Sequence, residues 1–133
     1  MGKIIINVDY TDNFAATPAD EAVACVVTAR TFAELQEEMK AALQTHIEWM
    51  RNDGDEIPAE FEGDWEFSWN LTVRALLHSL DGIISKAALS KATGINQQQL
   101  THYASGYRKA RPEMRRKIIL GIHRIANQLS AIS

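Results

Sequence analysis

Apolar side chains alternate with other residues in two stretches of the first half of the chain, residues 4–10 and 65–71. Alternation with a period of two is typical of β-strands that bury one face. Residues 14–17 can form a short strand after the turn signal Asp12-Asn13. The apolar, β-branched run 22–28 also has the length of a strand, and we expect it in the centre of the sheet.

Between the third and fourth of these strands the apolar period changes to three and four residues, which predicts a helix. Its apolar stripe consists of Phe32, Leu35, Met39, Leu43, Ile47 and Met50. Thr31 and Glu34 have the form of a capping box at the start of this helix, and Asn52-Asp53-Gly54 marks its end. The first half is therefore expected to have the order β-β-β-α-β.

The second half shows only helical spacings. A first helix is predicted by the pattern Val73, Leu76, Leu77, Leu80, Ile83 and Ile84. A last helix begins at Pro112, which suits a first helical turn, and its buried face is expected to be Ile118, Ile122, Ile125 and Leu129. Because the two halves are joined without a Gly/Ser-rich linker, we predict an α+β protein in which the last strand of an N-terminal domain, 1–70, runs almost directly into an all-α domain, 71–133.

Residues 85–106 predict two short helices joined by a tight turn. Gly94 stands where the first helix must stop, in a turn that needs a positive φ, and Asn96 suits the N-cap of the second helix. The residues expected to face inward are Ala88, Leu89, Ile95, Leu100 and Tyr103. An ordinary helical hairpin is the alternative, and the agreement of turn, cap, core and following loop argues against it. The residues left outside are then candidates for a function.

Those outer residues are Gln97, Gln98, Gln99, Thr101 and His102. Few helices carry three consecutive glutamines in an exposed first turn for stability alone. Glutamine can bond adenine bidentately in the major groove, and a recognition helix reads base edges from its N-terminal residues. The outer face of the second helix is therefore a candidate for reading DNA bases.

The pattern Leu89-Ser90-x-x-x-Gly94-Ile95-x-x-x-x-Leu100 resembles the helix-turn-helix of the phage-repressor (Cro/CI-like) class. The following loop, Gly106-Tyr107-Arg108-Lys109, fits the class as well, whereas Lys86 and Ala104 depart from its common residues. The resemblance implies binding to operator double-stranded DNA. The residues expected to contact bases or phosphates are Lys86, Asn96, Gln97, Gln98, Gln99, Thr101, His102, Arg108, Lys109 and Arg111.

Charge is divided sharply between the two halves. Residues 1–70 carry four basic and 15 acidic side chains, a net charge of −11, and residues 71–133 carry ten basic and two acidic ones, a net charge of +8. A basic half attracts phosphate backbones and an acidic half attracts a basic partner. Neutralisation of the halves by each other, within or between chains, is the alternative explanation.

The first half resembles the N-terminal domain of HicB antitoxins. The resemblance rests on Val26-Val27-Thr28, on Thr31-Phe32-Ala33-Glu34-Leu35 and on Asp53-Gly54-Asp55-Glu56-Ile57-Pro58. The loop "P-D-L-P-G-C", common in that family before the third strand, is absent here. The resemblance implies a partial RNase-H-like fold, and together with the second half it indicates the helix-turn-helix branch of the family.

The family resemblance also implies what the protein does and with what. It implies an antitoxin that neutralises a small, basic HicA-like mRNA-cleaving toxin by covering its active site, and that represses its own operon as a homodimer or higher oligomer. The acidic residues then expected to bind the toxin are Glu34, Glu37, Glu38, Glu48, Asp53, Asp55 and Glu56. Two alternatives remain: a stand-alone helix-turn-helix regulator whose first domain senses a ligand or dimerises, and a catalytically inactive RNase-H-like RNA binder.

Enzymatic chemistry is not expected. Asp9 and Asp12 lie in or after the first strand, but a second strand does not offer another inward acid for two-metal catalysis. The four histidines show no metal spacing with Cys25, which is expected to be an inert core residue in a strand. We expect no metal and no cofactor. The longest apolar runs are too short for a signal peptide or a membrane span, so a cytoplasmic protein without membrane contact is expected.

Overall fold

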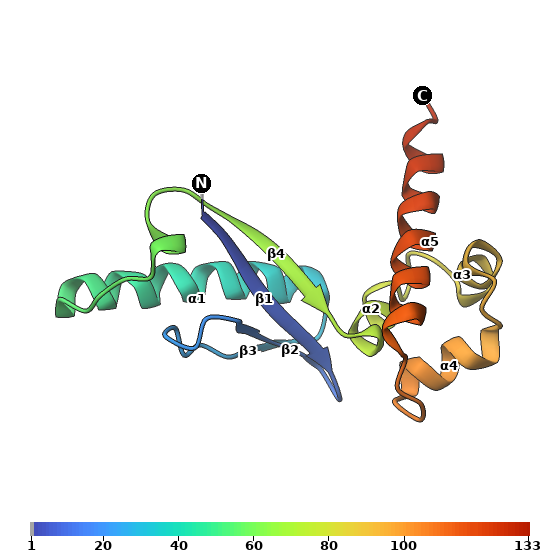
Figure 1. The fold of residues 1–133 in the computed structure, drawn as a ribbon, viewed down its shortest axis with the longest axis horizontal. Helices are drawn as coiled ribbons and strands as arrows, with labels where there is room; N and C mark the ends of the chain where they lie inside the picture. Colours follow the sequence, from blue (N-terminus) through green and yellow to red (C-terminus); the bar gives the residue numbers. More distant parts are fainter. Residues whose placement is uncertain (1) are drawn as a thin grey trace. The chain divides into compact units, whose positions relative to one another are not determined.

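The structure is a computed structural model that describes residues 2–133. It is a mixed α+β structure that divides into two compact units between Thr72 and Val73. We call residues 2–72 unit 1 and residues 73–133 unit 2, and describe each by itself (Figure 1). Among the helices of residues 2–133, none has the length and the apolar character needed to cross a membrane.

Unit 1 is a four-stranded sheet with one long helix. Its elements are β1 Gly2–Tyr10, β2 Phe14–Pro18, β3 Val27–Ala29, α1 Phe32–Asp53, the 3₁₀ turn η1 Ala59–Phe61 and β4 Trp65–Leu71. The sheet order is β3-β2-β1-β4. β1 pairs antiparallel with β2 and parallel with β4, and β2 pairs antiparallel with β3. The predicted order β-β-β-α-β is confirmed.

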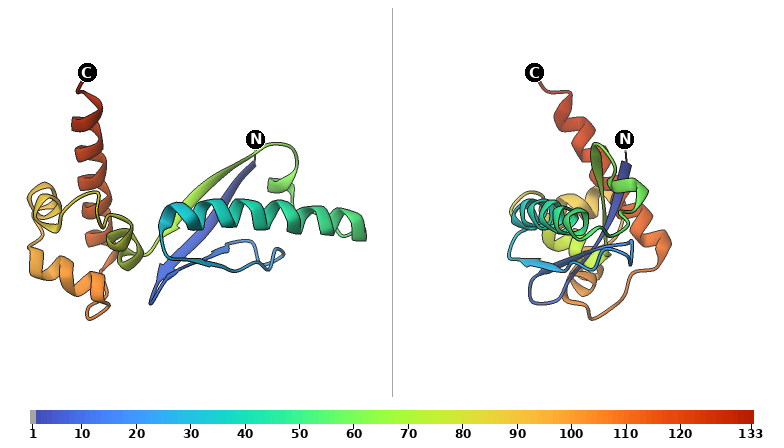
Figure 2. Two further views of the ribbon diagram at one scale, coloured as in Figure 1. Left: turned by 180° about the vertical axis from the view of Figure 1, so that it is seen from behind. Right: turned by 90° about the vertical axis from the view of Figure 1, so that its left-hand side faces the viewer.

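The core of unit 1 lies between one face of this sheet and α1 (Figure 2). Ile4, Ile6 and Val8 of β1 are fully buried and lie opposite Phe67, Trp69 and Leu71 of β4. From α1 the side chains that fill this layer are Leu35, Met39, Leu43 and Ile47. The helix ends are as predicted: the Thr31 Oγ1 accepts from the Glu34 N–H at 3.1 Å, and Gly54 closes the helix with φ 76°.

The expectation that residues 22–28 form a central strand of the sheet is wrong. Only Val27–Ala29 forms a strand, and it is the edge strand β3, whereas β1 and β2 hold the centre of the sheet. A turn occupies the beginning of the segment, because the Asp20 carboxylate and carbonyl accept from the N–H groups of Ala22 and Val23. Cys25 is therefore half-buried in irregular chain rather than in a strand, and burial raises the pKa of its thiol.

The aromatic residues of β4 form one connected group on the side of α1. Trp65, Phe67 and Trp69 are half-buried. The ring centroids of Trp65 and Phe67 are 6.1 Å apart, and those of Phe67 and Trp69 are 5.4 Å apart. Trp69 meets Phe32 of α1 edge to face at 5.7 Å, and Trp65 meets Phe61 of η1 at 5.2 Å. This face of β4 therefore contributes to the packing of unit 1.

Unit 2 consists of four helices, α2 Val73–Ser79, α3 Lys86–Thr93, α4 Gln97–Ser105 and α5 Pro112–Ser130. Only Thr72 separates β4 from α2, as the missing linker predicts. The His78 Nε2 of α2 donates to the Ala104 carbonyl of α4 at 2.8 Å, so this histidine ties two helices together. The buried cluster comprises Val73, Leu77, Leu89, Ile95, Leu100, Tyr103, Ala104 and Ile118.

Three apolar residues of unit 2 lie elsewhere than expected. Ile83 is 75% exposed because α2 already ends at Ser79 and the chain turns through Gly82 with φ 80°. Ala88 is exposed on α3, although Leu89 beside it is buried as predicted. Leu129 is 61% exposed on α5, so the predicted buried face of that helix is covered only in its first part.

α3 and α5 approach each other closely where Thr93 meets Gly121. A Cβ atom built on Gly121 would lie 2.5 Å from the Thr93 Cγ2, a distance that real contacts do not allow. One turn further along α5, the Arg124 guanidinium donates to the Ala92 carbonyl at 2.9 Å. The absence of a side chain at residue 121 therefore sets how closely the two helices pack.

We expect Gly121→Ala to destabilise unit 2 through this contact. Overpacking costs about 1–3 kcal/mol, against about 1 kcal/mol gained by replacing glycine in a helix. Thr93→Ser removes the Cγ2 but keeps the hydroxyl. In a urea-unfolding double-mutant cycle, Gly121→Ala should be less favourable in the wild-type background than in Thr93→Ser by about 1–3 kcal/mol. Equal effects in both backgrounds would contradict the contact.

Candidate nucleic-acid interface

α3 and α4 are joined by three residues, Gly94, Ile95 and Asn96. Gly94 is the C-cap of α3 with φ 78°, and its N–H donates to the Ser90 carbonyl at 2.8 Å. Ile95 is 5% exposed and packs into the core cluster. The Asn96 side chain then accepts from the Gln99 N–H at 2.8 Å and caps α4. The turn, corner and cap predicted from the sequence are confirmed.

Thr93 fixes the geometry of this turn. Its hydroxyl donates to the Leu89 carbonyl at 2.8 Å and accepts from the Ile95 N–H at 3.2 Å. One side chain thus bonds the last turn of α3 and the residue after the Gly94 bend. Both bonds are local, so they direct the chain from α3 into α4 without help from α5.

α4 is anchored on one side and open on the other. Leu100 and Tyr103 are buried at 0% and 5% exposure, as their spacing of three predicts. Gln97 and Gln98 are exposed in the first turn, and Thr101 is exposed one turn further along. The Thr101 hydroxyl donates to the Gln97 carbonyl at 3.0 Å, so its proton is already used within the helix. The two glutamine amides are therefore accessible from outside at this end of the helix.

Two of the predicted outer residues are partly turned away from solvent. Gln99 is half-buried, and its Nε2 donates to the Tyr103 hydroxyl at 2.6 Å. His102 is also half-buried, and its ring packs against the Tyr107 ring in a tilted arrangement, with 4.9 Å between centroids. The expectation that all three glutamines lie outside is therefore wrong for Gln99, because an i, i+4 partner draws its amide inward.

The loop after α4 holds an exposed aromatic ring and three basic residues, one of which lies near the ring. Tyr107 is 73% exposed, and the Arg108 guanidinium lies 6.0 Å from its ring centroid. The Arg108 N–H donates to the His102 carbonyl at 3.2 Å and holds the loop against the end of α4. Lys109 and Arg111 are exposed in the same loop, whereas Lys86 is half-buried at the start of α3.

Tyr107 is a candidate that sequence reasoning missed as a contact residue. Tyrosine hydroxyls are among the groups that bond DNA phosphates. The Tyr107 ring contacts the His102 ring of α4, and the Arg108 guanidinium of the same loop lies 6.0 Å from its centroid. Its place directly before Arg108 and Lys109, after the predicted recognition helix, was the signal. The sequence alone does not tell an exposed tyrosine from a buried one.

The acidic candidates of unit 1 are all exposed but do not form one cluster. Glu34, Glu37 and Glu38 lie in the first turns of α1. The other group lies at the opposite end of α1 and just after it, and comprises Glu48, Asp53, Asp55 and Glu56. With a rise of 1.5 Å per residue, Glu34 and Asp53 are roughly 28 Å apart along the helix axis. A single compact partner contact would use one group or the other.

Trp49 stands out on the same helix. It is 64% exposed, next in sequence to Glu48 and near the C-terminal acidic group. Exposed tryptophans are over-represented among residues that dominate protein interfaces. The sequence pattern did not identify Trp49 as a contact residue, because Trp49 lies off the apolar stripe of the helix and carries no charge.

Another pair of carboxyl groups meets between η1 and the turn before β3. The Glu60 side chain is hydrogen-bonded to Asp20, which lowers the pKa of Asp20 and raises the pKa of Glu60. Both groups lie at the surface. Among residues 2–133 the His, Cys, Asp and Glu side chains do not come together in any group of three that could hold a metal ion.

The chain was compared with protein-family models, with curated proteins and with solved structures. None of the three comparisons gives a match.

The N-cap of α4 can be tested on stability alone. We expect Asn96→Ala to lower the free energy of unfolding by about 1 kcal/mol, because the Gln99 N–H loses its acceptor. Asn96→Asp keeps an acceptor and should retain most of that stability. Ser85→Ala removes the equivalent cap of α3, where the Ser85 hydroxyl accepts from the Ala88 N–H, and should cost a similar amount in urea unfolding. An Asn96→Ala variant as stable as wild type would contradict the capping role.

Proposed function

We propose that this protein is a HicB-like antitoxin with two activities, neutralisation of a small basic toxin and repression of its own operon. One observation carries the DNA-binding part: the first turn of α4 presents Gln97 and Gln98 to solvent, while Leu100 and Tyr103 anchor the helix from beneath. In this proposal α3, the turn and α4 act as a helix-turn-helix of the Cro/CI-like kind.

The chemistry of this surface suits the major groove of DNA. The two glutamine amides can each bond the N6 and N7 edge of an adenine, and they stand at the N-terminal end of the helix, the end that reads bases in this motif. Arg108, Lys109 and Arg111 lie exposed in the loop that follows α4 and can bond phosphates. The net charge of +8 in residues 71–133 supports attraction to the DNA backbone.

The antitoxin part of the proposal draws on unit 1. A sheet of order β3-β2-β1-β4 with a parallel β1–β4 pair and one covering helix fits the reduced RNase-H-like fold that the HicB resemblance implies. The exposed carboxylates of α1 offer negative charge to a partner whose own surface is built to hold RNA phosphates. Trp49 is our first candidate for the residue at the centre of that contact.

We expect Gln97→Ala and Gln98→Ala to reduce discrimination between the DNA upstream of this gene and unrelated DNA. The reason is the loss of bidentate base contacts, each worth about 1–3 kcal/mol. The measurement is fluorescence anisotropy with labelled duplexes of both kinds. Both residues are exposed, so the unfolding midpoint should not change. Unchanged discrimination in the double variant would contradict base reading by this turn.

Matched variants in the loop should behave differently. Arg108→Ala and Lys109→Ala are expected to weaken binding to both duplexes alike, because phosphate contacts carry no sequence information. Each lost contact should also make the negative slope of log binding constant against log salt concentration shallower by about 0.9. A loss confined to the upstream duplex would show that these residues read bases instead.

Co-expression tests the antitoxin activity. We expect the small reading frame beside this gene to stop growth and shorten mRNA lifetimes when expressed alone, and to be harmless together with this chain. Trp49→Ala should weaken that protection because an interface tryptophan commonly contributes about 2 kcal/mol or more. Lys40→Ala, on an exposed position of the same helix, is the matched control. A neighbour that is harmless alone would favour the stand-alone regulator.

A further inference from the structure

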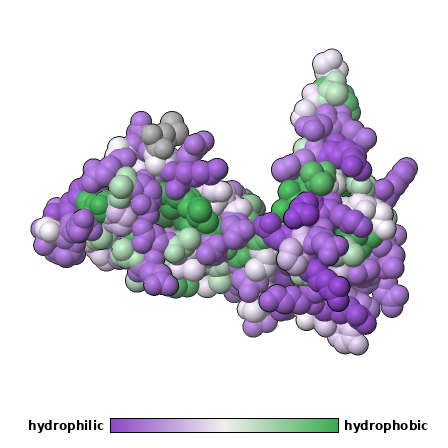
Figure 3. Space-filling view, viewed as in Figure 1, coloured by the Kyte–Doolittle hydropathy of each residue, from purple (hydrophilic) through white to green (hydrophobic). Residues whose placement is uncertain are grey.

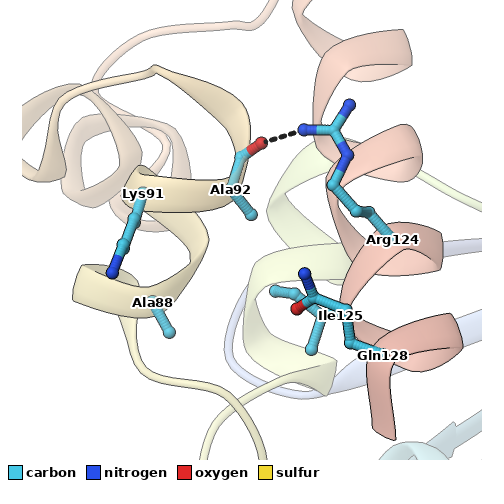
Figure 4. A pocket seen from close by; sticks show the side chains of 6 residues that line it. All are labelled: Ala88, Lys91, Ala92, Arg124, Ile125 and Gln128. Atoms are coloured by element: carbon cyan, nitrogen blue, oxygen red, sulfur yellow. Dashed lines mark hydrogen bonds between the residues drawn. The ribbon is translucent and has the colours of Figure 1, made fainter. Parts of the chain in front are cut away.

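A groove of about 440 Å³ opens between α3 and α5 (Figure 4). Sites that hold small molecules commonly have volumes of about 300–1,000 Å³. None of the residues proposed above to contact DNA or toxin lines this groove. Its lining comes from both helices and comprises Ala88, Lys91 and Ala92 of α3 and Arg124, Ile125 and Gln128 of α5.

The two walls run in opposite directions, which gives the groove two different ends. Thr93 meets Gly121, and the Ala92 carbonyl accepts from Arg124 one turn further along α5. Going away from this contact, the α3 wall continues to Ala88 and the α5 wall continues through Ile125 to Gln128 (Figure 4). The end near Arg124 is therefore basic, and the end near Ala88 and Ile125 is apolar.

The basic end has charge to offer to an anion. The Arg124 guanidinium has five N–H donors and uses one of them for the Ala92 carbonyl. Lys91, which precedes Ala92, is exposed on the rim of α3, and its flexible side chain can turn toward the same end. Both cations come from a unit with few carboxylates to neutralise them.

The only acidic side chains of unit 2 are Asp81 and Glu113. The Asp81 carboxylate lies 3.4 Å from the His78 ring nitrogen Nδ1 and is held there. Glu113 belongs to the first turn of α5. With a rise of 1.5 Å per residue, it is roughly 16 Å from Arg124 along the helix axis. The charge at the basic end of the groove is therefore available to a carboxylate from outside.

The other end of the groove suits an aliphatic chain. Ala88 and Ala92 leave space on the α3 wall, and Ile125 is half-buried on the α5 wall. Leu129 follows one turn after Ile125 on the same side of α5 and is 61% exposed. In Figure 3 apolar surface appears near this end of α5 among the hydrophilic side chains of unit 2. An aliphatic chain laid here would remove apolar surface from water.

We infer that the groove between α3 and α5 is a binding site for a small aliphatic carboxylate. The carboxylate bonds the outer edge of the Arg124 guanidinium, whose planar fork matches its two oxygens, and Lys91 adds a second positive charge. The aliphatic chain lies between Ala88 and Ile125. This inference goes beyond the proposed function, because neither DNA nor a toxin occupies the site.

The test is an NMR titration of the full chain, labelled at its alanine and isoleucine methyl groups, with octanoate below its micelle concentration. We expect saturable shifts of the Ala88, Ala92 and Ile125 methyl signals, while Ile6 in the core of unit 1 should not respond. Octanol lacks the charge and acetate lacks the chain. Each should bind at least about tenfold more weakly than octanoate, because it keeps one half of the recognition only.

Two variants test the two ends of the groove separately. Arg124→Gln should weaken octanoate binding about tenfold through loss of a charged hydrogen-bond donor. Ala88→Phe should weaken it as strongly by filling the apolar end, and because Ala88 is exposed the fold should be kept. Lys117→Gln removes an exposed cation of α5 outside the groove and is the matched control.

Four results would overturn the inference. They are the lack of saturable shifts, octanol binding as tightly as octanoate, full binding in both Arg124→Gln and Ala88→Phe, and an equal loss in Lys117→Gln. The unshifted methyl signals check that each variant stays folded. The titration contains no DNA and no toxin, so a chain that binds octanoate but no DNA would contradict the proposed function and leave this site intact.

Discussion

The close approach of α3 and α5 at Thr93 and Gly121 is the constraint on which the rest of unit 2 depends. The methyl group of Thr93 occupies the space that Gly121 leaves, and its hydroxyl bonds both sides of the bend at Gly94. Packing between helices and the direction of the chain into α4 are therefore set by one side chain. The position of the exposed turn that contains Gln97 and Gln98 therefore depends on this contact.

The sequence predicted most of the elements because their signals are local. The cap at Thr31, the bend at Gly94 and the cap at Asn96 each need only a few neighbouring residues, and all three are found where expected. The segment 22–28 was misjudged for the opposite reason. Its composition suits a strand, but the Asp20 turn takes the first residues, and strand position depends on pairing partners far away in sequence.

The outer residues show a second limit of pattern reading. Periodicity places Gln99 near Gln97 and Gln98, yet a hydrogen bond to Tyr103 draws it inward. Periodicity likewise assigned Leu129 to a buried face, but whether an apolar stripe is covered depends on how far the neighbouring helices reach. A spacing gives the side of a helix on which a residue lies and does not give its surroundings. The burial of each side chain therefore distinguishes Gln99 from Gln97 and Gln98, and Leu129 from the buried residues of α5, although their spacing does not.

The junction between the two units is the single residue Thr72, and hydrogen bonds hold it to β1. The Thr72 N–H donates to the Val8 carbonyl at 3.0 Å, and its hydroxyl donates to the Asp9 carboxylate at 2.8 Å, while α2 begins at the next residue. Proteases cut where several residues can extend freely into their active sites. The boundary between the units lacks such a stretch, so we expect proteases to leave the acidic and the basic half joined. Under the proposed function, a cell therefore always holds equal amounts of the toxin-binding unit and the DNA-binding unit.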